Sequence, residues 1–163
     1  MKTIIFGRHA KSSWKDFSLR DHDRPLNKRG YKDAKIIGQK LKEKGIIPDL
    51  LLTSSALRTL QTSELFLNYF NSTDIIVEEE LYLAPVSTFI KIANKIDNKI
   101  ETVMMIAHNP GITELANEFS NSYIPNIPTS GVFKVDFNIS HWKDLNTFNG
   151  KVNLYIFPKM FKQ

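Results

Sequence analysis

Short apolar runs alternate with helix-like segments from the start of the chain to residue 119. Four of these runs predict buried strands, because they are aliphatic and bounded by turn-forming residues. The strands are expected at residues 3–6, 50–52, 74–77 and 102–107. Strands that alternate with helices are typical of α/β proteins, so the pattern predicts a mainly parallel sheet between two layers of helices.

The segment 28–44 shows a clear amphipathic helical pattern. Its apolar residues fall at spacings of three and four: Ala34, Ile37 and Leu41. Lysines occupy much of the other face, as in a helix that packs one side on a sheet. Asn27 can cap the start of this helix, and Gly45 can end it.

Further helices are expected after the second, third and fourth strands. Ser54 or Ser55 can cap the helix that follows the second strand. Asn109 can cap the helix after the fourth strand, and Pro110 can take its first position. Apolar residues again recur every three or four positions: Phe89, Ile90, Ala93 and Ile96 in one helix, and Ile112, Leu115, Ala116 and Phe119 in the other.

Two more strands are expected beyond residue 119, at 131–137 and 151–157, with Trp142 in the connection between them. The chain shows no internal repeat, low-complexity tract or linker. We therefore predict a single domain over residues 1–163, with the fold of a three-layer α/β/α sandwich.

Composition agrees with this picture and narrows the chemistry. The 163 residues are 42% hydrophobic and 24% charged, which is ordinary for one globular domain. No apolar run approaches the roughly 18 residues of a membrane span, and a signal-peptide pattern is missing, so we expect a cytoplasmic protein with no membrane partner. The sequence contains no cysteine, which excludes thiolate nucleophiles and thiolate zinc sites.

The net charge of +5 favours an anionic ligand. The lysines are dispersed, however, and they form no basic run or arm. Aromatic residues interleaved with basic ones, which would stack on bases, are also missing. We therefore expect phosphate groups, and no nucleic acid, as the anionic partner.

Residues suited to phosphate follow three of the predicted strands. Arg8 and His9 come directly after the first strand, and His108 follows the fourth. Because ligands of open α/β sheets bind beyond the carboxyl ends of the strands, these side chains should face one site. Arg58 stands in the first turn of the helix after the second strand, where the helix dipole is already positive. A bound anion would stabilise it there, and Arg24 is a further candidate ligand.

The motifs around these residues resemble those of the histidine phosphatase superfamily. They are Arg8-His9-Ala10, Ser54-Ser55-Ala56-Leu57-Arg58-Thr59-Leu60-Gln61-Thr62, and His108-Asn109-Pro110-Gly111. Other features are similar to the SixA-type phosphohistidine phosphatases: the short length, Arg24-Pro25-Leu26, Thr129-Ser130-Gly131-Val132 and Pro158-Lys159. The resemblance covers nearly the whole chain and implies a phosphoglycerate mutase-like fold. The superfamily usually has Gly in place of Ala10, and the SixA-like branch accepts Ala there.

The resemblance implies that His9 attacks phosphorus, forms a phosphohistidine and is released by water, without metal or cofactor. The nucleophile must be neutral, and a guanidinium about 5 Å away would lower an imidazole pKa by about two units. The planar forks of Arg8, Arg58 and Arg24 suit phosphate oxygens. His108 is expected on the equatorial oxygens, where it gains a proton or donates a hydrogen bond.

The superfamily takes a general acid from the segment after the third strand, where this chain has three consecutive glutamates. Its position before Leu81-Tyr82 favours Glu80 among them. The alternatives are a solvated acidic rim, or a P–N substrate whose leaving nitrogen arrives already protonated and needs no strong acid. Lys11, Ser12 and Ser13 suit a capped turn as well as phosphate contact, and His22 and His141 are expected on the surface.

Three classes of function remain open at this point. The first is a phosphatase, acting on phosphohistidine in proteins or on small phosphorylated metabolites, and the lack of long insertions favours a site open to a protein loop. The second is a metal-dependent hydrolase, although the four histidines are not at ligand spacing. The third is a non-catalytic module that only binds anions.

Overall fold

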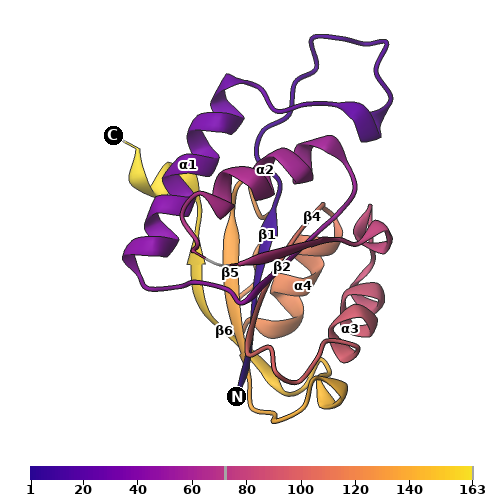
Figure 1. The fold of residues 1–163 in the computed structure, drawn as a ribbon, viewed down its shortest axis with the longest axis vertical. Coiled ribbons are helices and arrows are strands. Elements are labelled where there is room, and N and C mark those ends of the chain that lie inside the picture. The colour runs from indigo at the N-terminus through magenta and orange to yellow at the C-terminus, as the bar shows by residue number, and fades with distance from the viewer. Residues whose placement is uncertain (72, 163) are drawn as a thin grey trace.

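The computed structural model describes residues 1–71 and 73–162, and six of its strands form one sheet (Figure 1). The strands are β1 (Lys2–Arg8), β2 (Leu50–Thr53), β3 (Asp74–Val77), β4 (Thr102–Ala107), β5 (Val132–Phe137) and β6 (Gly150–Ile156). Their order across the sheet is β3-β2-β4-β1-β5-β6. The first four pair in parallel, β5 is antiparallel to β1, and β6 is antiparallel to β5. Only β5 therefore runs against the others, which confirms a mainly parallel sheet.

Helices cover both faces of this sheet (Figure 1). They are α1 (Lys28–Glu43), α2 (Leu57–Leu67), α3 (Val86–Asn94) and α4 (Gly111–Phe119). Side chains along β1 alternate between the faces, as a pleated strand requires. Ile5 packs in the cluster that contains α1 and α2, whereas Ile4 and Phe6 pack in the cluster that contains α3 and α4. The three-layer α/β/α sandwich is confirmed.

The strand β4 lies in the middle of the sheet because it is apolar on both faces. Its four central residues are fully buried: Val103, Met104, Met105 and Ile106. The edge strand β3, by contrast, is exposed along its length. Among the described residues, no helix is both long and apolar enough to cross a bilayer.

One of the predicted helix caps is present as expected, and another is shifted by one residue. The Asn27 side chain accepts the Gly30 N–H at 2.8 Å and starts α1. The predicted start of α4 was one residue off: Pro110 is the N-cap and Gly111 the first helical residue, although the Asn109 side chain still accepts the Thr113 N–H at 3.1 Å.

The predicted cap of α2 was wrong. Neither Ser54 nor Ser55 caps this helix, whose N-cap is Ala56 and has no side-chain cap. The Ser54 hydroxyl instead contacts the ring of His108, at 2.7 Å. The Ser54 hydroxyl therefore bonds to a residue that is distant in the sequence, and not to the backbone at the start of α2.

The register of the central strands places the carboxyl ends of β1, β2 and β4 next to one another. Arg8 at the end of β1 pairs with Ala107 at the end of β4. Thr53 at the end of β2 pairs with Ile106. The residues that follow these three strands, among them His9 and His108, therefore emerge side by side at the carboxyl edge.

A long connection from β1 to α1 closes over this edge and includes the 3₁₀ turn η1 (Asp21–Asp23). Backbone hydrogen bonds hold its two ends together, from Asn27 to the Lys11 carbonyl at 3.0 Å and from Ser13 to the Pro25 carbonyl at 2.7 Å. Gly30 of α1 lies against the same Lys11 carbonyl, so closely that a Cβ there would overlap it. The first turn of α1 thus anchors the connection.

We predict that Gly30→Ala lowers the free energy of unfolding by about 1–3 kcal/mol, because the added methyl group must displace backbone. Urea denaturation followed by circular dichroism measures the effect. Lys35→Ala, on the exposed face of the same helix, is the matched control and should change stability little. Equal stability of the two variants would contradict the anchoring contact.

Candidate active site

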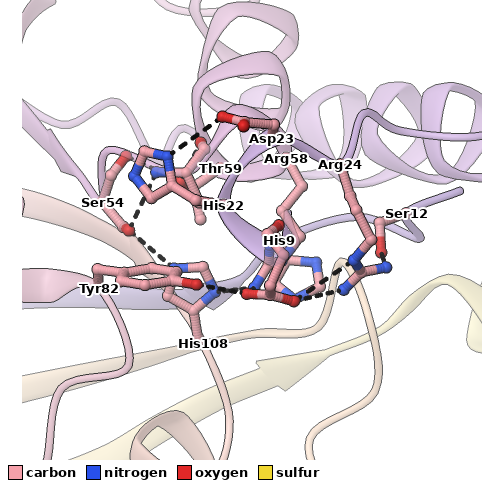
Figure 2. Close-up of polar contacts among 12 residues, drawn as sticks. His9, Ser12, His22, Asp23, Arg24, Ser54, Arg58, Thr59, Tyr82 and His108 are labelled. Carbon is pink, nitrogen blue, oxygen red and sulfur yellow. Dashed lines mark hydrogen bonds and ion pairs between the residues drawn. The ribbon is translucent and has the colours of Figure 1, made fainter. Parts of the chain in front are cut away.

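Two histidines and three arginines meet at the carboxyl edge of the sheet. His9 follows β1, His108 follows β4, and their ring centroids are 5.4 Å apart. Both histidines are almost fully buried. Figure 2 shows His9 and Arg58 lying between His108 on one side and Arg24 on the other. The structure thus brings together side chains that lie far apart in the sequence.

The contacts of His9 decide which of its ring nitrogens can react. Its Nδ1 lies 2.7 Å from the carbonyl oxygen of Ala10. A carbonyl oxygen can only accept, so the neutral ring carries its proton on Nδ1. The lone pair is therefore on Nε2. The backbone that follows His9 is also fixed, because the Ala10 N–H donates to the Thr62 hydroxyl of α2 at 2.9 Å.

His108 has the opposite tautomer. Its Nδ1 lies 3.2 Å from Nη2 of Arg58, and a guanidinium can only donate. The proton of the neutral ring therefore sits on Nε2, which donates to the Ser54 hydroxyl at 2.7 Å. Ser54 was missed from the sequence as a partner of His108, because it was assigned to the helix cap.

The three arginines reach the site from three different segments. Arg8 donates from Nη1 to the Ile127 carbonyl at 3.0 Å. Arg24 donates from Nη1 to the Ser12 hydroxyl at 2.7 Å. Arg58 is buried in α2. Within the described part of the chain, the buried Nε atoms of Arg8 and Arg58 have no hydrogen-bond partner, so both are donors that an anion could use.

Asp21 lies among these arginines, and sequence reasoning missed it. Its carboxylate accepts from Nη2 of Arg58 at 3.0 Å and pairs with Nη2 of Arg24 at 3.1 Å. The Tyr82 hydroxyl donates to the same carboxylate at 2.5 Å. The ion pair with Arg24, three residues further along the chain, was the one local signal that could have pointed to Asp21.

Partial burial favours the neutral acid at Asp21, but the opposing contacts outweigh it. Hydrogen bonds from Tyr82 and Arg24, together with the charge of Arg58, hold the pKa of the Asp21 carboxyl well below its usual range. Asp21 is therefore ionised at any physiological pH. Three guanidinium charges less this one carboxylate leave two positive charges in the cluster.

Comparisons with known proteins bear on the family and the fold of this chain. A family model described as histidine phosphatase superfamily (branch 1) matches residues 4–82. The solved structure of a SixA-type protein from Agrobacterium tumefaciens is 26% identical and has a TM-score of 0.83, covering 96% of this chain and 98% of that chain. These two similarities support membership of the histidine phosphatase superfamily.

Two more proteins are similar to this chain in fold or in sequence. A structure of the protein histidine phosphatase SixA complexed with tungstate has the same fold, with a TM-score of 0.81 at 22% identity over 98% of this chain and 99% of that one. An uncharacterized chloroplastic protein of Arabidopsis thaliana is 36% identical over 138 residues, which are 76% of this chain and 61% of that protein. The fold is that of SixA-type proteins, and these similarities support a phosphatase activity.

The electrostatics of the site keep both rings neutral. Burial, and then the charge of Arg58, lowers the pKa of His108 from 6.5 to about 3. Burial also lowers the pKa of His9 to about 3; the bond to the Ala10 carbonyl opposes this, and the charge of Arg58 adds to it. The expected direction at His9 is confirmed, but burial contributes more than the guanidiniums do.

The structure does not bring Glu80 into this cluster. The Glu80 side chain is 55% exposed and pairs with Lys91 at 3.7 Å. Within the described residues, no hydrogen bond or ion pair joins it to the histidines or arginines. Tyr82, two residues further on, is the residue of this segment that reaches the site, where its ring packs edge-on against His108 at 5.3 Å.

The prediction that His22 lies on the surface holds only in part. The side chain is half-buried, its Nε2 lies 2.9 Å from the Ser55 hydroxyl, and its ring packs on Tyr82 at 4.9 Å. The η1 turn carries it into the site together with Asp21. His141 is exposed, as expected.

The residues after Ala10 have separate roles. The Ser13 hydroxyl accepts the Lys15 N–H at 3.2 Å, which fits the turn alternative. The Ser12 hydroxyl positions Arg24. No group of three or more metal-ligating side chains is arranged around a common point in residues 1–71 and 73–162.

We predict that the rings of His9 and His108 stay neutral from pH 8 down to pH 5. Their lowered pKa values mean that protons bind only far below the value of about 6.5 for a free imidazole. Imidazole NMR shifts recorded across this range measure the effect. A titration midpoint above pH 6 at either ring would contradict it. Since the unfolded chain binds these protons first, folding stability should fall as the pH drops from 6.5 towards 3.

We also predict that Asp21→Asn binds inorganic phosphate a few-fold more tightly than the wild type. The substitution keeps the shape of the side chain but removes a charge that repels the anion, worth about 1 kcal/mol at about 5 Å in a water-like dielectric. Competitive inhibition constants measure it. Asp23→Asn is the matched control, because Asp23 pairs with the exposed Arg20 at 3.0 Å. Weaker phosphate binding in Asp21→Asn alone would show that Asp21 acts by positioning the arginines.

Proposed function

We propose that this protein hydrolyses phosphoryl groups through a phosphohistidine intermediate on His9, and that its substrate is phosphohistidine in a protein. The observation that carries the proposal is the bond from Nδ1 of His9 to the Ala10 carbonyl. It leaves a neutral Nε2 as nucleophile beside three guanidinium groups. A SixA-type fold supports the same assignment.

In the first step the arginines bind the phosphoryl oxygens and Nε2 of His9 attacks phosphorus. The bond from phosphorus to the leaving nitrogen breaks, and its electron pair returns to the leaving imidazole. The phosphorylated His9 ring is then cationic, and the Ala10 carbonyl stabilises its Nδ1 proton. In the second step water attacks phosphorus, and the electron pair of the P–Nε2 bond returns to His9 as inorganic phosphate forms.

Arg8, Arg58 and Arg24 are the proposed phosphate ligands. Their charge offsets that of the phosphoryl group, which would otherwise repel any nucleophile. Their preorganised donors also stabilise charge that develops on the equatorial oxygens. Because Asp21 occupies part of the forks of Arg58 and Arg24, the entering phosphoryl group must share these two residues with it.

The proposed role of His108 is to support the same oxygens. In the neutral state its Nδ1 accepts from Arg58 and so orients the guanidinium. As negative charge grows on the phosphoryl group, Nδ1 can gain a proton and donate to an oxygen in its turn. Ser54 keeps the ring in place throughout through Nε2.

The proposal needs no general acid at Glu80, which is paired with Lys91. A phosphohistidine whose second ring nitrogen carries a proton leaves as neutral imidazole. A phosphate ester leaves as an alkoxide, which requires a proton donor. A site without a protonated carboxylate therefore favours the P–N substrate.

The second candidate function is a phosphatase of small phosphorylated metabolites. It is favoured by the arginine cluster itself, which recognises the phosphoryl group whatever carries it. Turnover of a phosphohistidine-bearing carrier protein, compared with a panel of sugar phosphates, separates the two candidates. Higher kcat/KM on the sugar phosphates would assign the metabolite function.

We predict that a rapid quench without acid, during turnover of a ³²P-labelled substrate, traps label on His9. The P–N bond resists alkali and breaks in acid, so the label should survive base and disappear on acidification. His9→Ala should abolish both labelling and turnover, because no neighbouring side chain can replace the nucleophile. Peptide mapping of the labelled protein identifies the residue that carries the label.

His108→Ala serves as the comparison in this experiment. It should slow both labelling and turnover and leave the labelled residue unchanged. Label on Ser12 or Ser13, or full activity in His9→Ala, would end the proposal.

A further inference from the structure

Three large apolar side chains are exposed on the connection between β1 and α1. Trp14, Phe17 and Leu19 are 60%, 90% and 38% exposed. Single exposed apolar residues are ordinary, but three on one short segment beside a binding site are typical of an interaction surface. We call this group the aromatic rim. In Figure 1 the indigo connection that carries it projects beyond α1 and α2, at the end of the molecule away from the N-terminus.

A hydrogen-bonded turn holds the tip of this rim in place. The Asp16 carboxylate accepts both the N–H and the hydroxyl of Ser18, at 3.0 and 2.6 Å. The Asp16 carbonyl accepts the Leu19 N–H at 3.4 Å. Phe17 is therefore presented to solvent by a preformed turn. A partner that binds it does not have to order the loop first.

The inner end of the rim is part of the proposed phosphate site. The guanidinium carbon of Arg24 lies over the Trp14 ring, 3.6 Å from the ring centroid. The same guanidinium contacts Ser12 and Asp21. A ligand bound through its phosphoryl group at Arg24 is therefore also beside Trp14.

The charge of the cluster specifies what the ligand must carry. Arg8, Arg24 and Arg58, less Asp21, give two positive charges, and the two histidines are neutral. A phosphoryl group carries close to two negative charges at neutral pH. A phosphoryl group bound at Arg24 neutralises the cluster and lies beside Trp14, at the inner end of the rim. The exposed Phe17 side chain is then available to the molecule that carries the phosphoryl group.

We propose that the aromatic rim is the docking surface for a folded protein, one that presents a phosphohistidine surrounded by apolar side chains. The inference rests on the proposed function and adds to it a way of selecting proteins over small molecules. The phosphoryl group supplies the charged contact, and Trp14, Phe17 and Leu19 supply apolar contacts around it. Aromatic side chains are frequent anchors of protein interfaces.

The test compares Phe17→Ser with Phe148→Ser on two substrates. Phe148 is a matched control because it is 96% exposed and lines a surface hollow with Met1, at the end of β1 opposite Arg8. One substrate is a phosphohistidine-bearing carrier protein, and the other is phosphoramidate, a small molecule with the same P–N bond. Phe17 contacts no proposed phosphate ligand among the described hydrogen bonds and ring contacts, so its loss should leave phosphoramidate hydrolysis unchanged.

We predict that Phe17→Ser lowers kcat/KM on the carrier protein roughly tenfold, mainly by raising KM, as expected for an interface anchor. Its kcat/KM on phosphoramidate should equal that of the wild type, and Phe148→Ser should match the wild type on both substrates. Trp14→Ala should lower both activities, because it removes the ring that packs on Arg24.

Several outcomes would overturn the docking surface. One is a wild type that hydrolyses the carrier protein no better than phosphoramidate, and another is Phe17→Ser with unchanged activity on the carrier protein. In both cases phosphoramidate turnover through labelled His9 would still support the phosphatase, whereas a wild type that turns over neither substrate would end the proposed function itself. A wild-type dimer that Phe17→Ser converts to monomers in analytical ultracentrifugation would assign the rim to a second copy of this chain. Flotation of the wild type, but not Phe17→Ser, with anionic vesicles would assign it to a membrane.

Discussion

The ion pair between Arg58 and Asp21 joins the parts of the site into one unit. Arg58 is buried in α2, where an unpaired guanidinium would be strongly destabilising. Asp21 supplies both its carboxylate and its backbone carbonyl, at 3.0 and 2.8 Å. The same carboxylate contacts Arg24 and Tyr82, so one side chain sets the positions of the η1 turn, α2 and the segment after β3. Without it, the two arginines would repel each other.

Neutral histidines and charged arginines coexist in this cluster because they respond differently to burial. An imidazole with an ordinary pKa near 6.5 loses its proton when it is desolvated beside positive charge. A guanidinium keeps its charge under the same conditions. The same surroundings therefore prepare His9 as a nucleophile and keep Arg58 as an anion ligand. The bond from His9 to the Ala10 carbonyl then chooses the reactive nitrogen.

The phosphate site and the aromatic rim share one connection, the segment between β1 and α1. Arg24 lies in both, since it bonds to Ser12 and Asp21 on one side and packs on Trp14 on the other. Gly30 anchors this segment to α1 by close contact with the Lys11 carbonyl. A change in how the segment packs on α1 would therefore act on phosphate binding and on partner docking together.

The sequence alone determined the strands, the helices and four of the clustered residues, because these depend on local periodicity and on the strand-end rule. Arg8, His9, Arg58 and His108 each follow a predicted strand or begin the helix after one. It did not determine the partners of these residues. Asp21 lies 37 positions from Arg58 and 61 from Tyr82, and Ser54 lies 54 positions from His108. Contacts over such separations form only when the sheet register and the closed connection bring the segments together, so the tertiary structure decided them.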